Sequence, residues 1–165
     1  MKKSILRKGF TLVELVVVIG ILTILGTFTM LNLTTLQNHT NLNTSVETML
    51  SDIKQQQLKA MLGDTETRAT SSKYGVYFDA VNKRYVLFHG NSYSSSEASN
   101  YPVQLDSGLA FSSVTLPNNV IIFDRVSGEY SAYVGGSNTV VLKDIVTNTT
   151  KTMTFNRYGV ITQLN

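Results

Sequence analysis

The sequence predicts an α+β protein in which one long N-terminal transmembrane and amphipathic helix is followed by an antiparallel β-sheet domain. Three features of the 165-residue chain support this prediction. Residues 15–33 contain no charged side chain, apolar residues then recur at helical spacing, and short strand-like runs separated by turn residues fill the C-terminal part. We therefore expect a basic leader over residues 1–9, one helix over 10–62 and a β domain over 63–165.

The first half of the predicted helix has the length and composition of a membrane segment. At a rise of about 1.5 Å per residue, residues 10–33 are long enough to cross most of a hydrocarbon core of roughly 30 Å. Four basic side chains lie in the leader, and the next basic residue is Lys54. Because positive charge marks the cytoplasmic side of a membrane segment, we expect a single pass through the inner (cytoplasmic) membrane. The N-terminus would be cytoplasmic and the C-terminal domain extracytoplasmic.

The second half of the predicted helix is amphipathic. Its apolar residues are Leu42, Val46, Met49, Leu50, Ile53, Leu58, Met61 and Leu62. Their spacing is close to 3.6 residues, and most of the polar residues between Asp52 and Lys59 lie off this stripe. Gly63 is expected to end the helix, because glycine is favoured just after a helix C-terminus. The pattern predicts a helix about 80 Å long, whose second half packs on a globular domain.

The β domain is predicted from short apolar runs separated by turn residues. Strands are expected over residues 74–79, 84–89, 109–116, 120–124, 130–134, 139–145, 151–155 and 160–164. Residues 80–83 join the first two strands as a hairpin, and the short spacing of the runs favours antiparallel pairing. Residues 91–104 are polar and Ser-rich and contain Pro102, so a surface loop is expected there. Tyr93 and Tyr101 in this loop either pin it to the sheet or form an adhesive surface.

A single carboxylate, Glu14, stands near the start of the apolar run. A charged side chain at bilayer depth costs roughly 2.5–3.5 kcal/mol on insertion scales. A charged residue in a membrane segment is therefore expected to have a function. Gly9, Phe10, Thr11 and Leu12 precede it and complete the order Gly-Phe-Thr-Leu-x-Glu directly after the basic leader. This order, its position and the apolar run that follows resemble the type IV prepilin family, which includes pilins and the pseudopilins of type II secretion.

The resemblance implies a processing reaction and an assembly contact. A prepilin peptidase in the membrane would cut between Gly9 and Phe10 and then methylate the new amine of Phe10. The carboxylate of Glu14 would meet the N-terminal amine of a neighbouring subunit, because each charge is costly alone in lipid and pairing lowers that cost. The implied partners are the prepilin peptidase, other pilin or pseudopilin subunits, an inner-membrane assembly platform and membrane lipid.

Within this family the chain resembles the H-type minor pseudopilins of type II secretion and their minor-pilin relatives. The stretches that carry this resemblance are residues 51–62, 74–78 and 155–161. They imply a pilin-like fold and a minor pilin or pseudopilin that is assembled into a pilus or a type II secretion pseudopilus. A major pilin, a DNA-uptake (competence) pseudopilin and an unprocessed, membrane-anchored extracytoplasmic binding module are the alternatives.

No catalytic, cofactor, metal or nucleic-acid site is predicted. The chain has no cysteine, His39 and His89 are its only histidines, and neither a nucleophile elbow nor a phosphate-binding glycine motif occurs. The net charge of +3 comes from the leader: without residues 1–9, four of the 14 basic side chains are lost and 10 remain against 11 acidic ones. We therefore expect a protein that is not an enzyme and has no nucleic-acid partner.

Overall fold

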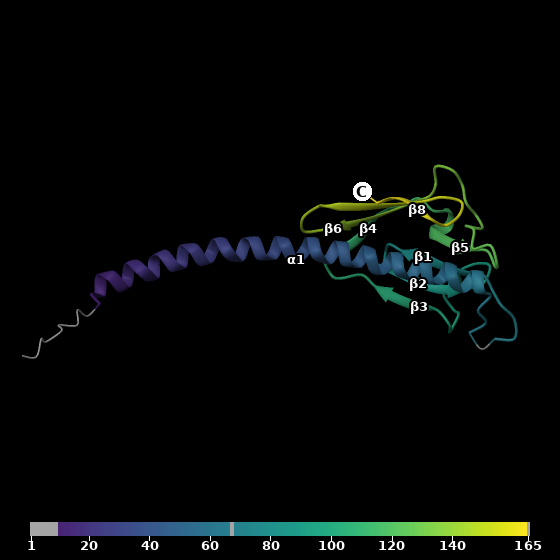
Figure 1. Cartoon of the computed structure of the whole chain (residues 1–165), viewed down its shortest axis with the longest axis horizontal. Coiled ribbons are helices and arrows are strands. Elements are labelled where there is room, and N and C mark those ends of the chain that lie inside the picture. The colour runs from purple at the N-terminus through teal and green to yellow at the C-terminus, as the bar shows by residue number, and fades with distance from the viewer. Residues whose placement is uncertain (1–9, 67, 165) are drawn as a thin grey trace, which may run out of the picture. The chain divides into compact units, whose positions relative to one another are not determined.

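The computed structural model describes residues 10–66 and 68–164, with the side chains of residues 27–41 outside this description. Over the described range the chain forms one long α-helix, a short 3-10 helix and eight strands (Figure 1). Helix α1 spans Leu12–Leu62. It ends at Gly63, whose φ of +64° is left-handed, a conformation that glycine adopts without steric cost. The predicted long helix and its end at Gly63 are confirmed.

The strands form two four-stranded antiparallel sheets. The first has the order β3-β2-β1-β5 and the second the order β4-β6-β7-β8. The first sheet contains β1 (Tyr74–Asp79), β2 (Arg84–His89), β3 (Tyr101–Gln104) and β5 (Val120–Phe123). The second contains β4 (Leu109–Val114), β6 (Thr139–Asp144), β7 (Thr150–Phe155) and β8 (Ile161–Leu164), and the 3-10 helix Pro117–Asn119 precedes β5. The predicted α+β fold class is confirmed.

The hairpin between β1 and β2 is held by one side chain. Asp79 accepts hydrogen bonds from the backbone N–H of Asn82 at 3.1 Å and from Nε of Arg84 at 3.0 Å. Burial alone would raise the pKa of Asp79, but the hydrogen bonds from Asn82 and the Arg84 guanidinium lower it below its usual value. The carboxylate therefore stays charged at neutral pH and closes the turn.

Residues 101–104, predicted as the end of a surface loop, instead form strand β3. Tyr101 lies opposite Leu87 of β2 in this pairing. β3 is the edge strand of its sheet, and an edge strand can contain Pro102 because it needs no backbone N–H donor on its free side. The prediction was wrong here because proline was taken as evidence against any strand.

The loop that precedes β3 covers the outer face of the first sheet. The ring of Tyr93 stacks on that of Tyr77, with centroids 4.1 Å apart, and meets Phe88 edge-on at 5.5 Å. Together with two residues of β5 these rings form a second, smaller apolar cluster. Tyr93 therefore pins the loop to the sheet, whereas Tyr101 has 66% of its surface exposed.

Residues 130–134, predicted as a strand, form only isolated bridges in the described part of the chain. Tyr130 bridges to Phe123, and Val134 bridges to Ser137. The ring of Tyr130 is buried and its hydroxyl donates to the carbonyl of Val120 at 3.0 Å. Tyr130 thus anchors the loop to the core. Aromatic residues are also frequent in strands, and the strand prediction for this segment was wrong for that reason.

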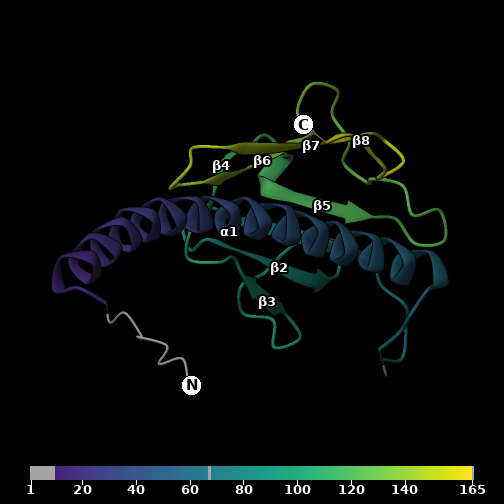
Figure 2. The ribbon, with the colours of Figure 1, turned by 60° about the vertical axis from the view of Figure 1, so that its left-hand side comes forward.

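The main core lies between α1 and both sheets, and Figure 2 shows the C-terminal part of the helix running across them. Its members from the helix are Leu42, Val46, Met49, Ile53 and Ala60, and those from the strands include Tyr74, Phe78, Phe123, Leu142, Met153 and Phe155. Each large apolar side chain that is fully buried stabilises the folded state by roughly 1.5–3 kcal/mol relative to leaving it exposed. No strand of one sheet pairs with a strand of the other in the described residues, so this shared core joins them.

The buried face of α1 differs from the predicted apolar stripe in its last two turns. Leu58, Met61 and Leu62 are exposed, whereas Gln56 and Ala60 are buried. The 3.6-residue period explains the difference, because positions 56 and 60 continue the face of position 53 and position 58 points away from it. The predicted stripe was wrong here because it followed apolar residues and not the helical period.

The chain divides into two compact units, and the division falls inside α1. One unit ends at Gln37 and the other begins at Asn38. Residues 38–62 of the helix therefore belong to the same unit as the two sheets, and the residues before them form a unit of their own.

The close packing of β1 against β5 predicts that Gly75→Ala destabilises the domain. A Cβ at position 75 would lie 2.6 Å from the carbonyl oxygen of Ile121 and 2.8 Å from the ring of Phe88. Backbone in the centre of a sheet cannot move away cheaply, so we expect a loss of about 1–3 kcal/mol in the free energy of unfolding. Urea unfolding of the full chain in detergent micelles measures it. Gly108→Ala is the matched control, because no atom lies within 4 Å of its added Cβ; equal stability of the two variants would contradict the packing described.

Candidate functional site

The first turn of α1 is organised by Thr11. Its hydroxyl oxygen accepts a hydrogen bond from the backbone N–H of Glu14 at 3.2 Å, and its carbonyl accepts one from the N–H of Leu15 at 3.2 Å. Thr11 is therefore the N-cap residue, and Glu14 occupies the third helical position, the spacing of a capping box. The negative charge of Glu14 also lies at the positive end of the helix dipole. This arrangement places Phe10 immediately before the helix and Glu14 in its first turn.

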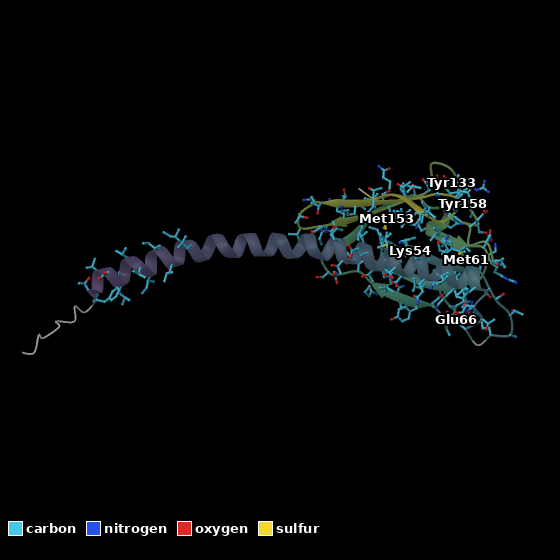
Figure 3. The ribbon with its side chains drawn as sticks, viewed as in Figure 1. Lys54, Met61, Glu66, Tyr133, Met153 and Tyr158 are labelled. Carbon is cyan, nitrogen blue, oxygen red and sulfur yellow. The ribbon has the colours of Figure 1, made fainter. Side chains whose placement is uncertain are left out.

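Residues 10–26 expose apolar side chains around the whole helix (Figure 3). The large apolar residues exposed there are Phe10, Leu12, Val13, Leu15, Val16, Val17, Val18, Ile19, Ile21, Leu22, Ile24 and Leu25. The hydroxyl of Thr23 donates to the carbonyl of Ile19 at 2.7 Å and so remains satisfied within the helix. A helix that is apolar on all sides is normally covered by lipid or by other protein.

Among the residues that the structure describes, no helix is both long enough and apolar enough to cross a membrane.

The predicted site residues lie at or next to the helix start. Phe10 is 77% exposed, and Glu14 is exposed one turn further on. Gly9 lies outside the described residues, as do the side chains of the last part of the predicted membrane segment, residues 10–33. The carboxylate of Glu14 is the single charge among residues 10–26.

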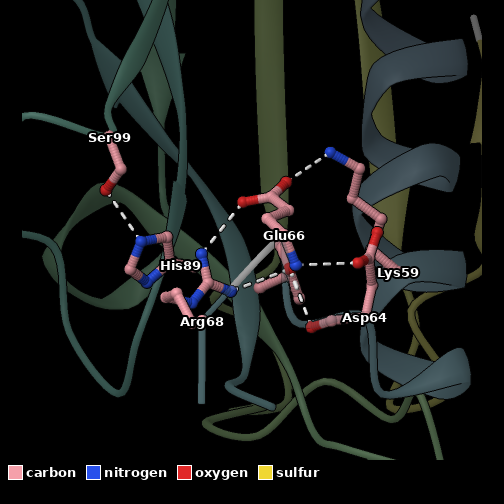
Figure 4. A network of polar contacts seen from close by, with 7 residues as sticks. Lys59, Asp64, Glu66, Arg68, His89 and Ser99 are labelled. Atoms are coloured by element: carbon pink, nitrogen blue, oxygen red, sulfur yellow. Dashed lines mark hydrogen bonds and ion pairs between the residues drawn. The ribbon is translucent and has the colours of Figure 1, made fainter. Parts of the chain in front are cut away.

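A second group of polar residues, not predicted from the sequence, joins the C-terminal end of α1 to the loop that follows it (Figure 4). Glu66 accepts hydrogen bonds from Lys59 at 2.6 Å and from Arg68 at 3.0 Å. Arg68 also donates to the hydroxyl of Tyr74 at 2.9 Å, and that hydroxyl donates to the carbonyl of Asp64 at 2.9 Å. Glu66 thus neutralises two cations beside the start of β1.

The charge of Glu66 is stabilised by these partners. Burial alone would raise the pKa of Glu66, but hydrogen bonds and ion pairs with Lys59 and Arg68 lower it below its usual value. Its loop has no periodic pattern in the sequence, so no signal short of the tertiary structure could have found the cluster. In the described ranges no group of three or more His, Cys, Asp or Glu residues could hold a metal ion. His89 shares a hydrogen bond of 2.7 Å with Ser99.

Comparisons with known proteins agree with the geometry of the helix start. Residues 6–30 match the family model of the prokaryotic N-terminal methylation motif. Among solved structures, the chain is similar to the minor pseudopilin EpsH from the Type 2 Secretion System of Vibrio cholerae, with a TM-score of 0.52 and 14% identity over 76% of this chain and 96% of that chain. The chain therefore combines a prepilin-type N-terminal motif with a fold similar to that of a minor pseudopilin. The comparison with curated proteins gives no match.

The fold of the prepilin-like protein is that of a minor pseudopilin, as the resemblance of its sequence implied. The N-terminal motif and this fold together support a type IV pilin-like subunit. Pilins and pseudopilins are structural subunits.

The polar cluster around Glu66 predicts an acid-dependent loss of stability in the prepilin-like protein. Because the pKa of Glu66 is lowered in the folded state, its contribution is fully present above the ordinary Glu pKa of about 4.3 and is lost as the pH falls through the folded value. We expect Glu66→Gln to lower stability by up to about 1 kcal/mol at pH 7, the range of exposed ion pairs, and by progressively less as the pH falls through the lowered pKa of the folded state. Thermal unfolding followed by circular dichroism from pH 7 to pH 3 measures the difference.

The matched control for that experiment is Glu97→Gln. Glu97 is an exposed carboxylate for which the described residues supply no ion pair. A difference between wild type and Glu66→Gln that stayed constant over the whole pH range would contradict the charge-based account.

Proposed function

We propose that a prepilin peptidase cleaves this chain between Gly9 and Phe10 and methylates the new amine of Phe10. The mature subunit then joins other pilin or pseudopilin subunits through an assembly platform in the inner membrane. The matched motif, which includes Gly9, Phe10 and Glu14, supports this proposal. The Thr11 cap supports it as well, because it starts the helix directly after the proposed cleavage site and leaves Phe10 accessible.

The proposed orientation places the N-terminus in the cytoplasm and the β domain outside the membrane. The four basic residues of the leader and the uncharged run that follows support this orientation through the positive-inside rule. In the proposed membrane state, lipid covers the apolar residues of the first unit before assembly, and neighbouring helices cover them afterwards.

Glu14 is proposed as the assembly residue. The observation that carries the proposal is an exposed carboxylate that is the single charge on an apolar helix surface over residues 10–26. Cleavage would add an ammonium group at Phe10, and pairing this cation with Glu14 of a neighbouring copy removes two separate desolvation costs. Such a contact joins unlike surfaces of two copies, and contacts of that kind build open helical filaments and not closed dimers.

The proposed assembly is the pseudopilus of a type II secretion system, and the structural likeness to a minor pseudopilin of such a system supports this choice. A pilus or a DNA-uptake filament would use the same processing and the same Glu14 contact. An unprocessed, membrane-anchored binding module would use neither. The proposed role is structural in each filament, and catalysis is not part of it.

Glu14→Val tests the proposed assembly contact. We expect the variant to be processed normally, because the residues at the cleavage site are unchanged. We expect its incorporation into filaments alongside wild type to fall at least about tenfold, because the Phe10 ammonium of a neighbour loses its partner. Quantitative mass spectrometry of sheared filaments and of membranes measures incorporation and processing in the same cells.

Glu47→Val is the matched control for that test. Glu47 is an exposed carboxylate on the same helix, outside the apolar run, and its replacement should leave incorporation unchanged. Filaments that contain Glu14→Val in the wild-type proportion would contradict the charge-pairing proposal.

A further inference from the structure

A solvent-accessible pocket of about 310 Å³ lies beside the polar cluster, between α1, the end of β2 and the start of β3. Asp52, Gln56 and Lys59 line it from the helix, His89 from β2, and Tyr101 from β3. β3 pairs with β2 only as far as Leu87. His89 therefore lies past the edge strand, and Ser99 of the preceding loop shares a hydrogen bond of 2.7 Å with its ring there.

Two acceptor groups of the pocket, on Gln56 and Asp52, have no cationic partner among the described residues. Gln56 is only 3% exposed, and its amide oxygen is buried and accepts no hydrogen bond among the described residues. A buried acceptor without a partner costs about 1–3 kcal/mol, and native proteins rarely keep one without a use for it. Asp52 lies one helical turn earlier on the same face, and the described part of the chain offers it no ion pair.

The hydrogen-bond partner of Asp52 is a neutral hydroxyl group. The hydroxyl of Tyr85 donates to Oδ2 of Asp52 at 2.5 Å. Burial and the neighbouring carboxylate raise the pKa of Tyr85, so its hydroxyl keeps its proton and remains a neutral donor. Asp52 therefore has a hydrogen bond but no ion pair among the described residues.

The cations at the pocket are paired with Glu66, which itself lines the pocket, although Nε of Arg68 is buried and has no hydrogen-bond partner among the described residues. Nζ of Lys59 pairs with Glu66 at 2.6 Å, and Arg68 pairs with the other oxygen of Glu66 at 3.0 Å (Figure 4). Tyr101, 66% exposed at the rim, offers an aromatic face to a positively charged group. A carboxylate, a buried amide oxygen and an aromatic face together match a group with several N–H donors and one positive charge.

We propose that this pocket binds the guanidinium or ammonium group of an arginine or lysine side chain on another protein chain. The cation would donate hydrogen bonds to Asp52 and Gln56 and contact the ring of Tyr101. This contact is independent of the proposed pairing through Glu14, because it uses residues of the second unit alone.

The test is a chemical-shift titration of the full chain in detergent micelles, followed at the Gln56 side-chain amide and the His89 ring. The probes are the peptide acetyl-Gly-Arg-Gly-amide, the same peptide with neutral citrulline in place of arginine, and the free amine agmatine. We expect the arginine peptide to bind with a Kd of about 1 mM, in the range of a single charge-assisted contact. The citrulline peptide should bind at least tenfold more weakly.

Three variants make the titration specific. Asp52→Asn keeps an acceptor for Tyr85 but removes the charge. Gln56→Met removes the buried acceptor at similar volume. Each variant should bind the arginine peptide at least about fivefold more weakly than wild type. Glu47→Gln removes a charge from the same helix outside the pocket and should leave binding unchanged. If Asp52→Asn unfolds, Gln56→Met decides the question.

The proposal is overturned by any of three results. One is equal binding of the arginine and citrulline peptides. Another is unchanged binding by folded Asp52→Asn or by Gln56→Met. The third is binding of agmatine without binding of the arginine peptide, which would assign the pocket to a small free cation and not to a side chain of a protein.

Discussion

The burial of one face of α1 is the constraint on which the second unit depends. The two sheets are separate in hydrogen bonding, and the side chains of residues 42–60 on the buried face complete a core that both sheets share. The face continues past Ile53 through Gln56 and Ala60 because the helical period dictates it, even though one of these residues is polar. The position of Gln56 at the pocket is a direct result, since the helix places its amide oxygen where the described residues supply no donor.

The first half of the same helix is under a different constraint. Residues 10–26 are apolar around the helix and exposed in the single chain, so their stability depends on what surrounds them. Thr11 and Glu14 define the start of the helix by local hydrogen bonding, without help from tertiary contacts. A segment of this kind can leave lipid and enter a bundle of similar helices without losing structure, because its backbone hydrogen bonds are internal to the helix.

The sequence predicted the features that depend on local pattern. The bounds of β1 and β2 agree with the prediction, as does the end of α1 at Gly63, because each is set by alternation, turn residues or a left-handed glycine. It failed at β3, where the edge position tolerates Pro102, and at residues 130–134, where Tyr130 is buried as a loop anchor. The role of Glu14 stays a prediction, which a local motif made possible. The cluster of Lys59, Glu66 and Arg68 and the pocket beside it could not be predicted, because they are assembled by tertiary folding.

The central claim is that the chain becomes a filament subunit only when a free amine at Phe10 is available to pair with Glu14 of another copy. The most direct measurement is mass spectrometry of the N-terminal peptide, on protein purified from membranes of cells that possess the processing peptidase. We predict a chain that begins at Phe10 and carries a methyl group on its amine. A chain that still begins with residues 1–9 in those cells would contradict the account and leave a tethered β domain.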